Sequence, residues 1–225
     1  TLFPYTTLFR SLTALLGRVP LDTVLQPSLR GNELDWDKVV DGIEKAKLLN
    51  LNISDQGALT INQVRSKARN LKRTHGIDML VVDYIGLMNG LDARQQRTYQ
   101  LEEISRGLKS LAKELAIPVL CLAQLNRKVE ERTDQSPNLS DLRDSGAIEQ
   151  DADVVLFVHR PIQTRPDMGD EWKHYAKVIA AKNRQGRCGG LSLTYIGEQT
   201  RFASWAGEAP TRRTAHTGRG GDVGL

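Results

Sequence analysis

The chain is organised around the stretch Met79 Leu80 Val81 Val82 Asp83 Tyr84, an apolar run that ends in a carboxylate and then an aromatic ring. A short apolar run rich in Val predicts a strand buried on both faces, as in parallel sheets. Asp83 therefore lies at the carboxyl end of this strand. Ligands bind at that edge of open α/β sheets, where a carboxylate can hold a metal ion directly or through water. The stretch has the form of a Walker B segment, although an Asp in this position can also cap the next turn.

A second strand of the same kind follows one helix later. Residues 101–115 predict a helix, whose apolar face consists of Leu101, Ile104, Leu108, Leu111, Ala112 and Leu115. Pro118 ends this pattern, and residues 119–123 predict a second buried strand that leads into Gln124. Because the crossover between neighbouring parallel strands is right-handed, Asp83 and Gln124 should emerge at the same edge of the sheet.

Further elements follow from the apolar periodicity. Helices are expected at residues 35–49 and 60–75, a third buried strand at 154–158 and a strand at 175–181. An antiparallel pair is expected at 191–196 and 201–203, around the turn at Gly197. The helix at 60–75 also carries five basic residues without an acidic neighbour, namely Arg65, Lys67, Arg69, Lys72 and Arg73. They predict either a solvated helix face or a phosphate contact.

Composition excludes several classes of protein. A chain of 225 residues can bury the core of one folded domain, and its formal charge of +4 is too small to indicate nucleic-acid binding by itself. The two cysteines make neither a disulfide framework nor a zinc site, and the sequence has no signal peptide and no long apolar span. We therefore expect a protein of the cytoplasm without a membrane segment.

The two ends of the chain are expected to lie outside the domain. Residues 1–10 show no helical or strand period that continues into the next residues, and they are interpreted as a non-native leader. Residues 206–225 are rich in Gly, Arg, Thr and Pro, a composition that buries too little apolar surface to stay ordered. The folded domain is expected to span residues 11–205.

Six segments together resemble one known family. They are LVVDYIGLM (80–88), EISRGLKSLAKEL (103–115), PVLCLAQLNR (118–127), LSDLRDSGAIEQDADVVLFVHR (139–160), AKNRQG (181–186) and LTYIGEQTRF (193–202). Over about Leu12 to Phe202 the chain is similar to the RecA-like motor domain of DnaB-family replicative DNA helicases. The resemblance implies an α/β fold with a mainly parallel sheet flanked by helices and an antiparallel C-terminal extension.

The resemblance also implies roles at the nucleotide. Asp83 would organise the water shell of Mg²⁺ on ATP, and Gln124 would sense the γ-phosphate, unless its amide only caps a turn. Lys182 and Arg184 would reach the nucleotide of a neighbouring subunit, and a solvated strand end is the alternative for this pair. Their spacing of two along an extended segment points both side chains to one face.

A DNA-binding segment follows from the same resemblance. Arg143, Asp144 and Gly146 match the loop that grips the phosphate backbone of single-stranded DNA, with Asp144 where the family usually has Glu. Arg94 and Arg97 lie where a second DNA loop would be. The alternative for the first loop is that its charges cap neighbouring helices. Since no aromatic residues lie among these basic ones, the grip should be independent of base sequence.

One motif of such motors is missing from the sequence. They need G-x-x-x-x-G-K-[ST] to cradle the phosphates, and no Gly of this chain is followed by Lys. The family's general-base Glu is missing as well. We therefore interpret the chain as an N-terminally truncated piece. The phosphate-loop strand would belong between those at 119–123 and 154–158, so its loss should leave open edges, low stability and little or no ATP hydrolysis.

The resemblance implies an ATP-dependent, hexameric helicase that translocates on single-stranded DNA and unwinds duplex at the replication fork. Its cofactors would be ATP and Mg²⁺. Its partners would be single-stranded DNA, its neighbours in a homohexamer, a primase and a helicase loader, with no membrane. Two alternatives remain: a RecA-like recombinase or repair ATPase, which lacks the DLR-SGAIEQDAD segment, and a non-catalytic module that binds single-stranded DNA or joins a ring.

Overall fold

The computed structural model of this chain describes residues 4–25, 33–132 and 134–211, without the side chains of residues 4–6, 33–34 and 143–145. The expected tail at 206–225 falls largely outside this part of the chain. The α-helices are α1 (Pro4–Gly17), α2 (Leu21–Leu25), α4 (Glu33–Lys47), α5 (Ile61–His75), α6 (Arg97–Leu115), α7 (Gly146–Asp151) and α8 (Pro161–Thr164). Short 3₁₀ helices are η1 (Ile85–Leu87), η2 (Arg127–Glu131), η3 (Leu139–Ser145), η4 (Asp170–Trp172) and η5 (Gly197–Gln199). The strands are β1 (Leu80–Val82), β2 (Val119–Cys121), β3 (Val154–His159), β4 (Tyr175–Asn183), β5 (Gly189–Ile196) and β6 (Arg201–Ser204).

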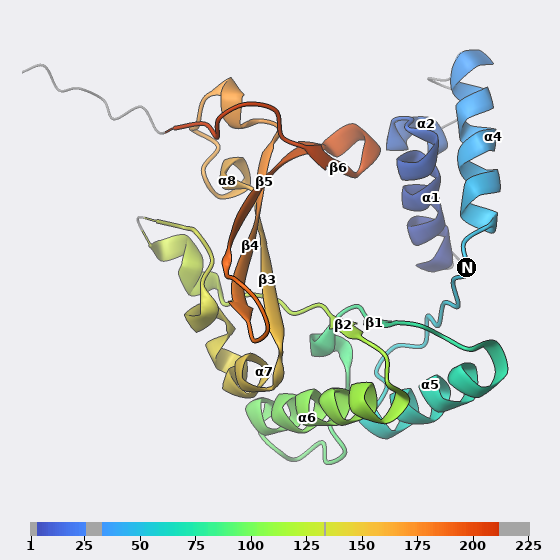
Figure 1. Cartoon of the computed structure of the whole chain (residues 1–225), viewed down its shortest axis with the longest axis vertical. Helices are drawn as coiled ribbons and strands as arrows, with labels where there is room; N and C mark the ends of the chain where they lie inside the picture. The colour runs from blue at the N-terminus through green and yellow to red at the C-terminus, as the bar shows by residue number, and fades with distance from the viewer. Residues whose placement is uncertain (1–3, 26–32, 133, 212–225) are drawn as a thin grey trace, which may run out of the picture.

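The described strands form two sheets (Figure 1). β1 and β2 pair in parallel, with Leu80 opposite Val119 and Val82 opposite Cys121. The larger sheet has the order β3-β4-β5-β6, and all its pairs are antiparallel. The expectation of a mainly parallel sheet is therefore wrong for the described residues, because β3 finds its hydrogen-bonded neighbour in β4. The expected antiparallel extension is confirmed.

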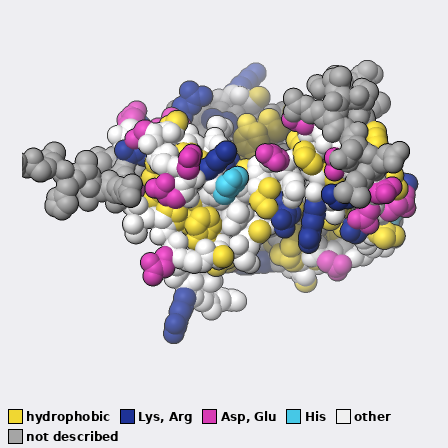
Figure 2. All heavy atoms as spheres, turned by 90° about the horizontal axis from the view of Figure 1, so that it is seen from above, with side chains coloured by type: hydrophobic (Ala, Val, Ile, Leu, Met, Phe, Trp, Pro, Cys, Tyr) yellow, Lys and Arg dark blue, Asp and Glu magenta, His cyan; other side chains and the backbone are white. Residues whose placement is uncertain are grey.

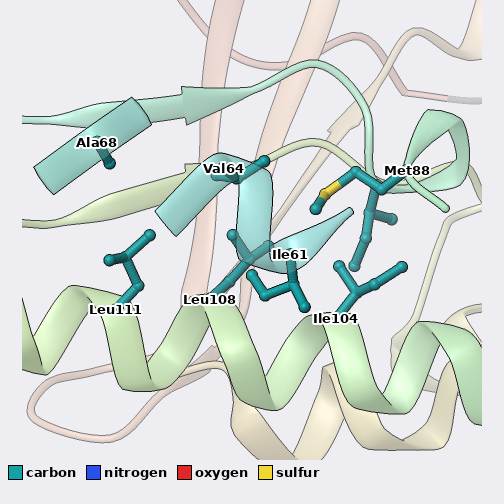
Figure 3. Packing of buried hydrophobic residues seen from close by; sticks show 8 residues of the cluster. Ile61, Val64, Ala68, Met88, Ile104, Leu108 and Leu111 are labelled. Carbon is teal, nitrogen blue, oxygen red and sulfur yellow. The ribbon is translucent and has the colours of Figure 1, made fainter. Parts of the chain in front are cut away.

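The main core lies between α5, α6 and the parallel strand pair (Figure 3). Its members are Ile61, Val64, Ala68, Ile85, Met88, Ile104, Leu108 and Leu111. Helix α6 approaches α5 closely at Gly107, where an added Cβ would lie 2.3 Å from Cγ1 of Ile61. Each fully buried Ile or Leu stabilises the fold by about 1.5–3 kcal/mol, so this packing holds the two short strands in place.

Local signals set the ends of α5. Thr60 caps its first turn in a reciprocal capping box with Gln63, and Gly76 ends it in the left-handed conformation at φ 68°. Both ends agree with the sequence-based prediction. The helix expected at 35–49 is displaced by two residues and spans Glu33–Lys47.

The chain begins with a helical pair. Helix α1 packs against α4 through two glycines: an added Cβ at Gly17 would lie 2.4 Å from the carbonyl oxygen of Lys38, and one at Gly42 would lie 2.5 Å from that of Thr13. Since α1 runs without a break from Pro4 to Gly17, the expectation that residues 1–10 lack a continuing helical period is wrong. Pro4 suits the first turn of a helix, and no Gly or Pro interrupts the chain before Gly17. The non-native origin of residues 1–10 stays a prediction.

One face of three strands is open to solvent. On the parallel pair and just after it, Val81, Leu120 and Leu122 are 45–52% exposed. On β3 the exposure alternates along the strand. Val154, Leu156 and Val158 are 49–60% exposed, whereas Val155 and Phe157 are 6% and 4% exposed. The expected burial of these strands on both faces is therefore wrong. In the view of Figure 2, apolar side chains lie at the surface among charges of both signs. The open apolar face agrees with the expectation of uncovered apolar side chains on these strands.

Two neighbouring residues of β3 test this face. Leu156→Lys should change the free energy of unfolding by no more than about 0.5 kcal/mol and should lower self-association, because about half of the side chain is already exposed to water. Phe157→Ala should cost about 3–5 kcal/mol, because it opens a cavity under the sheet. Denaturant unfolding and sedimentation velocity measure the two effects. Equal destabilisation by both variants would show that Leu156 is covered in solution.

Candidate functional site

Asp83 and Gln124 leave the parallel strand pair at the same edge. The register of β1 and β2 brings the strand ends side by side, and the pairing continues past them: the Leu122 N–H donates to the Val82 carbonyl at 2.9 Å, and the Ile85 N–H donates to the Leu122 carbonyl at 3.0 Å. Both side chains are exposed. The predicted common edge is confirmed, and the role of each residue stays a prediction.

Neither side chain has a partner within the part of the chain that the structure describes. Helix η1 begins after Tyr84 without any side-chain cap, so Asp83 does not cap the turn that follows its strand. Gln124 also makes no hydrogen bond to a described residue. The described residues therefore do not support the turn-capping alternative, and both polar groups are available to a ligand.

Gln124 borders a pocket of about 260 Å³. Its lining comes from the two strand ends and from the segment that leads into α7, and includes Tyr84, Gly86, Gln124, Asn126, Asp141 and Ile148. The pocket thus lies between the strand end that carries Gln124 and residues that flank the predicted DNA-binding segment, and Asp83 is not part of its lining.

Lys182 and Arg184 both bind the carboxyl end of α7. Nζ of Lys182 donates to the Glu149 carbonyl at 2.5 Å and to the Gln150 carbonyl at 3.3 Å, and Nη2 of Arg184 donates to the same Gln150 carbonyl at 2.6 Å. The last carbonyls of a helix lack intrahelical partners and carry partial negative charge, which cations offset. The two side chains share one face, as their spacing predicts. They are not simply solvated, and their role toward a neighbour stays a prediction.

Asp153 completes this cluster. Its carboxylate pairs with Lys109 of α6 and lies 3.4 Å from Nη1 of Arg184. The hydrogen bond from Lys109 holds the pKa of Asp153 below its usual value, and the charge of Arg184 adds to that effect. Sequence analysis missed Lys109 and Asp153, because 44 residues separate them and no local pattern links them.

The predicted DNA-binding segment lies at the junction of η3 and α7. The backbone of Arg143 and Asp144 belongs to η3, and their side chains fall outside the described part. Gly146 opens α7 with right-handed helical angles, and an added Cβ there would meet nothing within 4 Å. The space beside its backbone is therefore open, as close approach of a phosphate requires.

The two arginines of the second predicted loop differ. Arg97 donates to the carbonyls of Met88 at 3.0 Å and Gly86 at 2.8 Å, so it ties the first turn of α6 to η1. Arg94 is exposed in the loop before α6. Arg97 thus has a structural task that its sequence position did not indicate, and its contact with DNA stays a prediction.

Four of the five basic residues of α5, all except Lys72, border an open depression of about 710 Å³. Arg69 in this row forms two hydrogen bonds with Glu114 of α6, one of them 3.0 Å from Nη2 to Oε2. These bonds lower the pKa of Glu114 and raise that of Arg69. Part of the charge on α5 is therefore used between helices, and both alternatives stay open for the other basic residues.

Comparison with known proteins decides the family. The sequence model described as "DnaB-like helicase C terminal domain" matches residues 4–204. The chain belongs to this DnaB-like family. The match also covers part of the stretch 1–10 that was interpreted as a leader.

Individual DnaB relatives agree. The replicative DNA helicase DnaB of Haemophilus influenzae is 42% identical over 196 residues, which cover 86% of this chain and 41% of that protein. The DnaB of Buchnera aphidicola from Acyrthosiphon pisum is 40% identical over 193 residues, with 84% and 42% covered. The chain therefore spans about two-fifths of the length of these curated relatives.

Solved structures share the fold. One of them, described as an ATPase domain, superposes with a TM-score of 0.84 at 33% identity and covers 91% of this chain, which matches 72% of that one. A DnaB-like replicative helicase described with its primase interactions gives 0.85 at 33% identity, with 91% and 49% covered. The RecA-like DnaB fold expected from the six segments is confirmed. None of the described helices combines the length and the apolar character that crossing a membrane requires.

The two cysteines provide a test of the strand that carries Gln124. Burial raises the pKa of the Cys121 thiol on β2 to about 11, whereas Cys188 is exposed. A thiol of that pKa is only about 0.1% thiolate at pH 8, so iodoacetamide should modify Cys188 and leave Cys121 intact until denaturant is added. Mass spectrometry of tryptic peptides measures both sites. Comparable rates at the two cysteines would mean that β2 is not formed in the isolated chain.

Proposed function

We propose that this chain is part of the motor domain of a replicative DNA helicase, in which Asp83 and Gln124 serve Mg²⁺-ATP and residues 143–146 grip single-stranded DNA. The observation that carries the proposal is the parallel pairing of β1 and β2, which brings two unpartnered polar side chains to one edge of the sheet. The family match supports a helicase over the recombinase alternative.

The donor set fits the proposed cofactor. Mg²⁺ is commonly held by one or two carboxylates together with substrate phosphates and water, rather than by a cage of protein ligands. The described residues contain no group of three or more His, Cys, Asp or Glu that could hold a metal, and Asp83 supplies one exposed carboxylate. Bound Mg²⁺ would neutralise phosphate charge. Asp83 would then orient its water shell, and Gln124 would hydrogen-bond the γ-phosphate.

Lys182 and Arg184 are proposed to act on the nucleotide of a neighbour in a homohexamer. To do so they must exchange the carbonyls of Glu149 and Gln150 for phosphate oxygens. Phosphate oxygens carry full negative charge and Arg can bind them in a bidentate way, whereas carbonyls carry only partial charge, so the exchange becomes favourable once a phosphate is within reach. Their present contacts hold the pair together at one end of β4.

The proposed grip on DNA uses Arg143 and the open backbone at Gly146, with Asp144, Arg94 and Arg97 as further contacts. It would act on phosphates and ignore base identity. One structural neighbour is described with its primase interactions, and we propose a primase and a loader as partners of the whole cytoplasmic protein. Unwinding at the replication fork is proposed on the same family basis.

We further propose that a phosphate-loop strand fits between β2 and β3. Support comes from the sequence, in which no Gly precedes a Lys, and from the half-exposed apolar residues on both strands. If so, the isolated chain is a non-catalytic single-strand-binding or ring-joining piece, which is the second candidate function.

DNA binding is testable on the chain as it exists. Fluorescence anisotropy with labelled oligo(dT) at several salt concentrations should give a linear dependence of log affinity on log salt. Arg143→Gln should weaken binding and reduce the magnitude of that slope by about 0.7, the value for one lost phosphate contact on a single strand. Lys45→Gln, which removes an equal charge from an exposed pair on α4, is the control. An unchanged affinity for Arg143→Gln would refute the assigned grip.

Catalysis is tested by two measurements together. The isolated chain should release no phosphate from ATP above a protein-free blank, with or without oligo(dT), because its sequence has no G-x-x-x-x-G-K-[ST] motif to cradle the phosphates. Sequencing the gene upstream should then reveal G-x-x-x-x-G-K-[ST], followed by a strand that carries Glu. A stop codon and a native start near Leu12 would instead favour the non-catalytic module.

A further inference from the structure

We infer that the ion pair between Arg132 and Asp141 is a positioning device that fixes the DNA-gripping segment, residues 143–146, relative to the strand end that carries Gln124. The inference rests on the proposed function of that segment. It assigns a role to two residues that the proposed function does not otherwise use.

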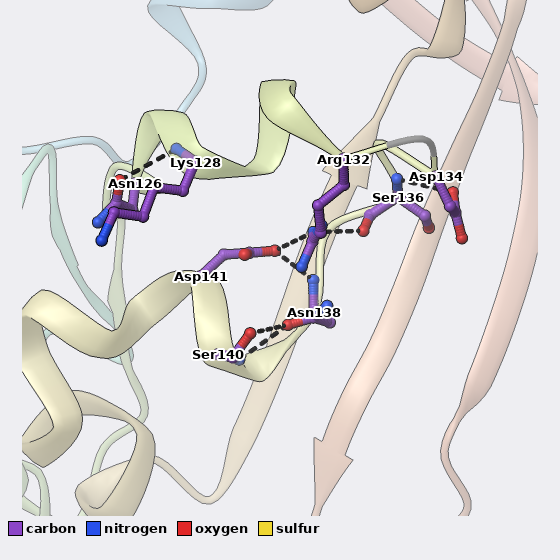
Figure 4. A network of polar contacts seen from close by, with 8 residues as sticks. All are labelled: Asn126, Lys128, Arg132, Asp134, Ser136, Asn138, Ser140 and Asp141. Atoms are coloured by element: carbon purple, nitrogen blue, oxygen red, sulfur yellow. Dashed lines mark hydrogen bonds and ion pairs between the residues drawn. The ribbon is translucent and has the colours of Figure 1, made fainter.

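Asp141 is the buried centre of a network of polar contacts (Figure 4). Its side chain is 5% exposed, and Oδ2 accepts hydrogen bonds from Nη2 of Arg132 at 2.7 Å and from the Asn138 N–H at 2.8 Å. The same Nη2 donates to the Ser136 carbonyl at 2.9 Å. The Arg132–Asp141 pair thus joins the end of η2 to η3, across the loop that connects them.

The backbone of Asp141 makes a second connection. Its carbonyl accepts from the Asn126 N–H at 3.0 Å, and Asn126 follows Gln124 by two residues. Leu142, the next residue, is 7% exposed and packs with Val155 and Phe157 of β3. Asp141 and Leu142 are therefore anchored on three sides, and the chain continues directly from this anchor into Arg143.

The charge of Arg132 is used inside the protein. A buried carboxylate that loses its cation is left uncompensated, so the pair is expected to act as a unit. The side chain of Arg132 is 33% exposed and faces Asp141 and the Ser136 carbonyl. The effect of Arg132 on DNA should therefore come through the shape of the loop and not through a phosphate contact.

A direct charge effect and a positioning role predict opposite changes in DNA affinity for the substitution Asp141→Asn. If charge alone mattered, Asp141→Asn would tighten DNA binding, because it removes a negative charge beside the grip. If Asp141 positions the segment, the same substitution weakens binding and leaves the salt slope unchanged. A phosphate-contacting residue such as Arg143 changes the slope as well.

The experiment compares Arg132→Gln, Asp141→Asn and the double variant. Lys45→Gln and Asp41→Asn break a different, exposed ion pair with the same charge changes and serve as matched controls. Each protein is measured by oligo(dT) anisotropy and by amide hydrogen exchange. Exchange reports the order of residues 139–146 without any DNA.

Both single substitutions should weaken oligo(dT) binding about tenfold. The double variant should bind no more weakly than either single variant, because all three remove the same interaction. Arg132→Lys keeps a cation within reach of Asp141 and should stay within about threefold of the parent chain. Exchange should quicken at 139–146 and not in the core of α5 and α6. The two controls should leave affinity and exchange unchanged.

Three results would overturn the inference: tighter binding by Asp141→Asn, unchanged exchange at residues 139–146, or exchange that quickens equally in α5 and α6. The last result would mean that the pair only stabilises the whole fold. Failure of the proposed function looks different. The parent chain would then not bind oligo(dT), while the exchange comparison would still report whether the pair orders the segment.

Discussion

Parallel pairing of β1 with β2 is the constraint on which the proposed nucleotide edge depends. Each strand has only three residues, and an isolated two-stranded pair of that length is marginal in water. The pair persists because α5 and α6 pack over it, with Ile104 and Leu111 fully buried and Gly107 admitting Ile61 at close range. The positions of Asp83 and Gln124 are therefore set by helix packing, at a distance from the edge itself.

The segment from η3 through α7 is held at both ends by different parts of the fold. At its start, Asp141 is bound by the loop that follows β2, and at its end the last carbonyls of α7 are bound by Lys182 and Arg184 from β4. Ser105 of α6 adds a hydrogen bond to Asp151 at 2.8 Å. A shift of either end can pass along the segment, because η3 ends at Ser145 and α7 begins at Gly146 with no loop between them. The proposed DNA grip is thus connected to both groups of residues that are proposed to act on nucleotides.

The sequence predicted this site unevenly, for physical reasons. Apolar runs and the crossover rule were enough to bring Asp83 and Gln124 to one edge, because both signals are local and topology leaves one arrangement. Local capping chemistry likewise set the ends of α5. The pairs Arg132–Asp141 and Lys109–Asp153 were missed, because no periodicity specifies which charges meet after folding. The N-x-x-D pattern from Asn138 to Asp141 was a usable signal for a capping box at η3.

The wrong prediction of the sheet type also arose because a local pattern does not specify its partner. An apolar run predicts that a strand will be buried, but it does not predict which strand will pair with it. The run at 154–158 was therefore compatible with a parallel neighbour as well as with β4. On β3 that requirement is half met: Val155 and Phe157 are covered, whereas Val154, Leu156 and Val158 are not. Neither the antiparallel pairing nor the described loops cover these three exposed side chains.

The free energy gained by covering these exposed side chains limits which kind of segment can cover them. Covering a half-exposed Leu or Val recovers about 1 kcal/mol, whereas fixing one backbone residue of an incoming strand costs about 1–2 kcal/mol. Apolar contact with β2 and β3 alone therefore roughly cancels the cost of ordering a strand between them. Hydrogen bonds to both open edges and apolar side chains on the strand itself must supply the net stability. A polar segment would not gain enough free energy to stay ordered between β2 and β3, whereas a strand that is apolar on both faces would.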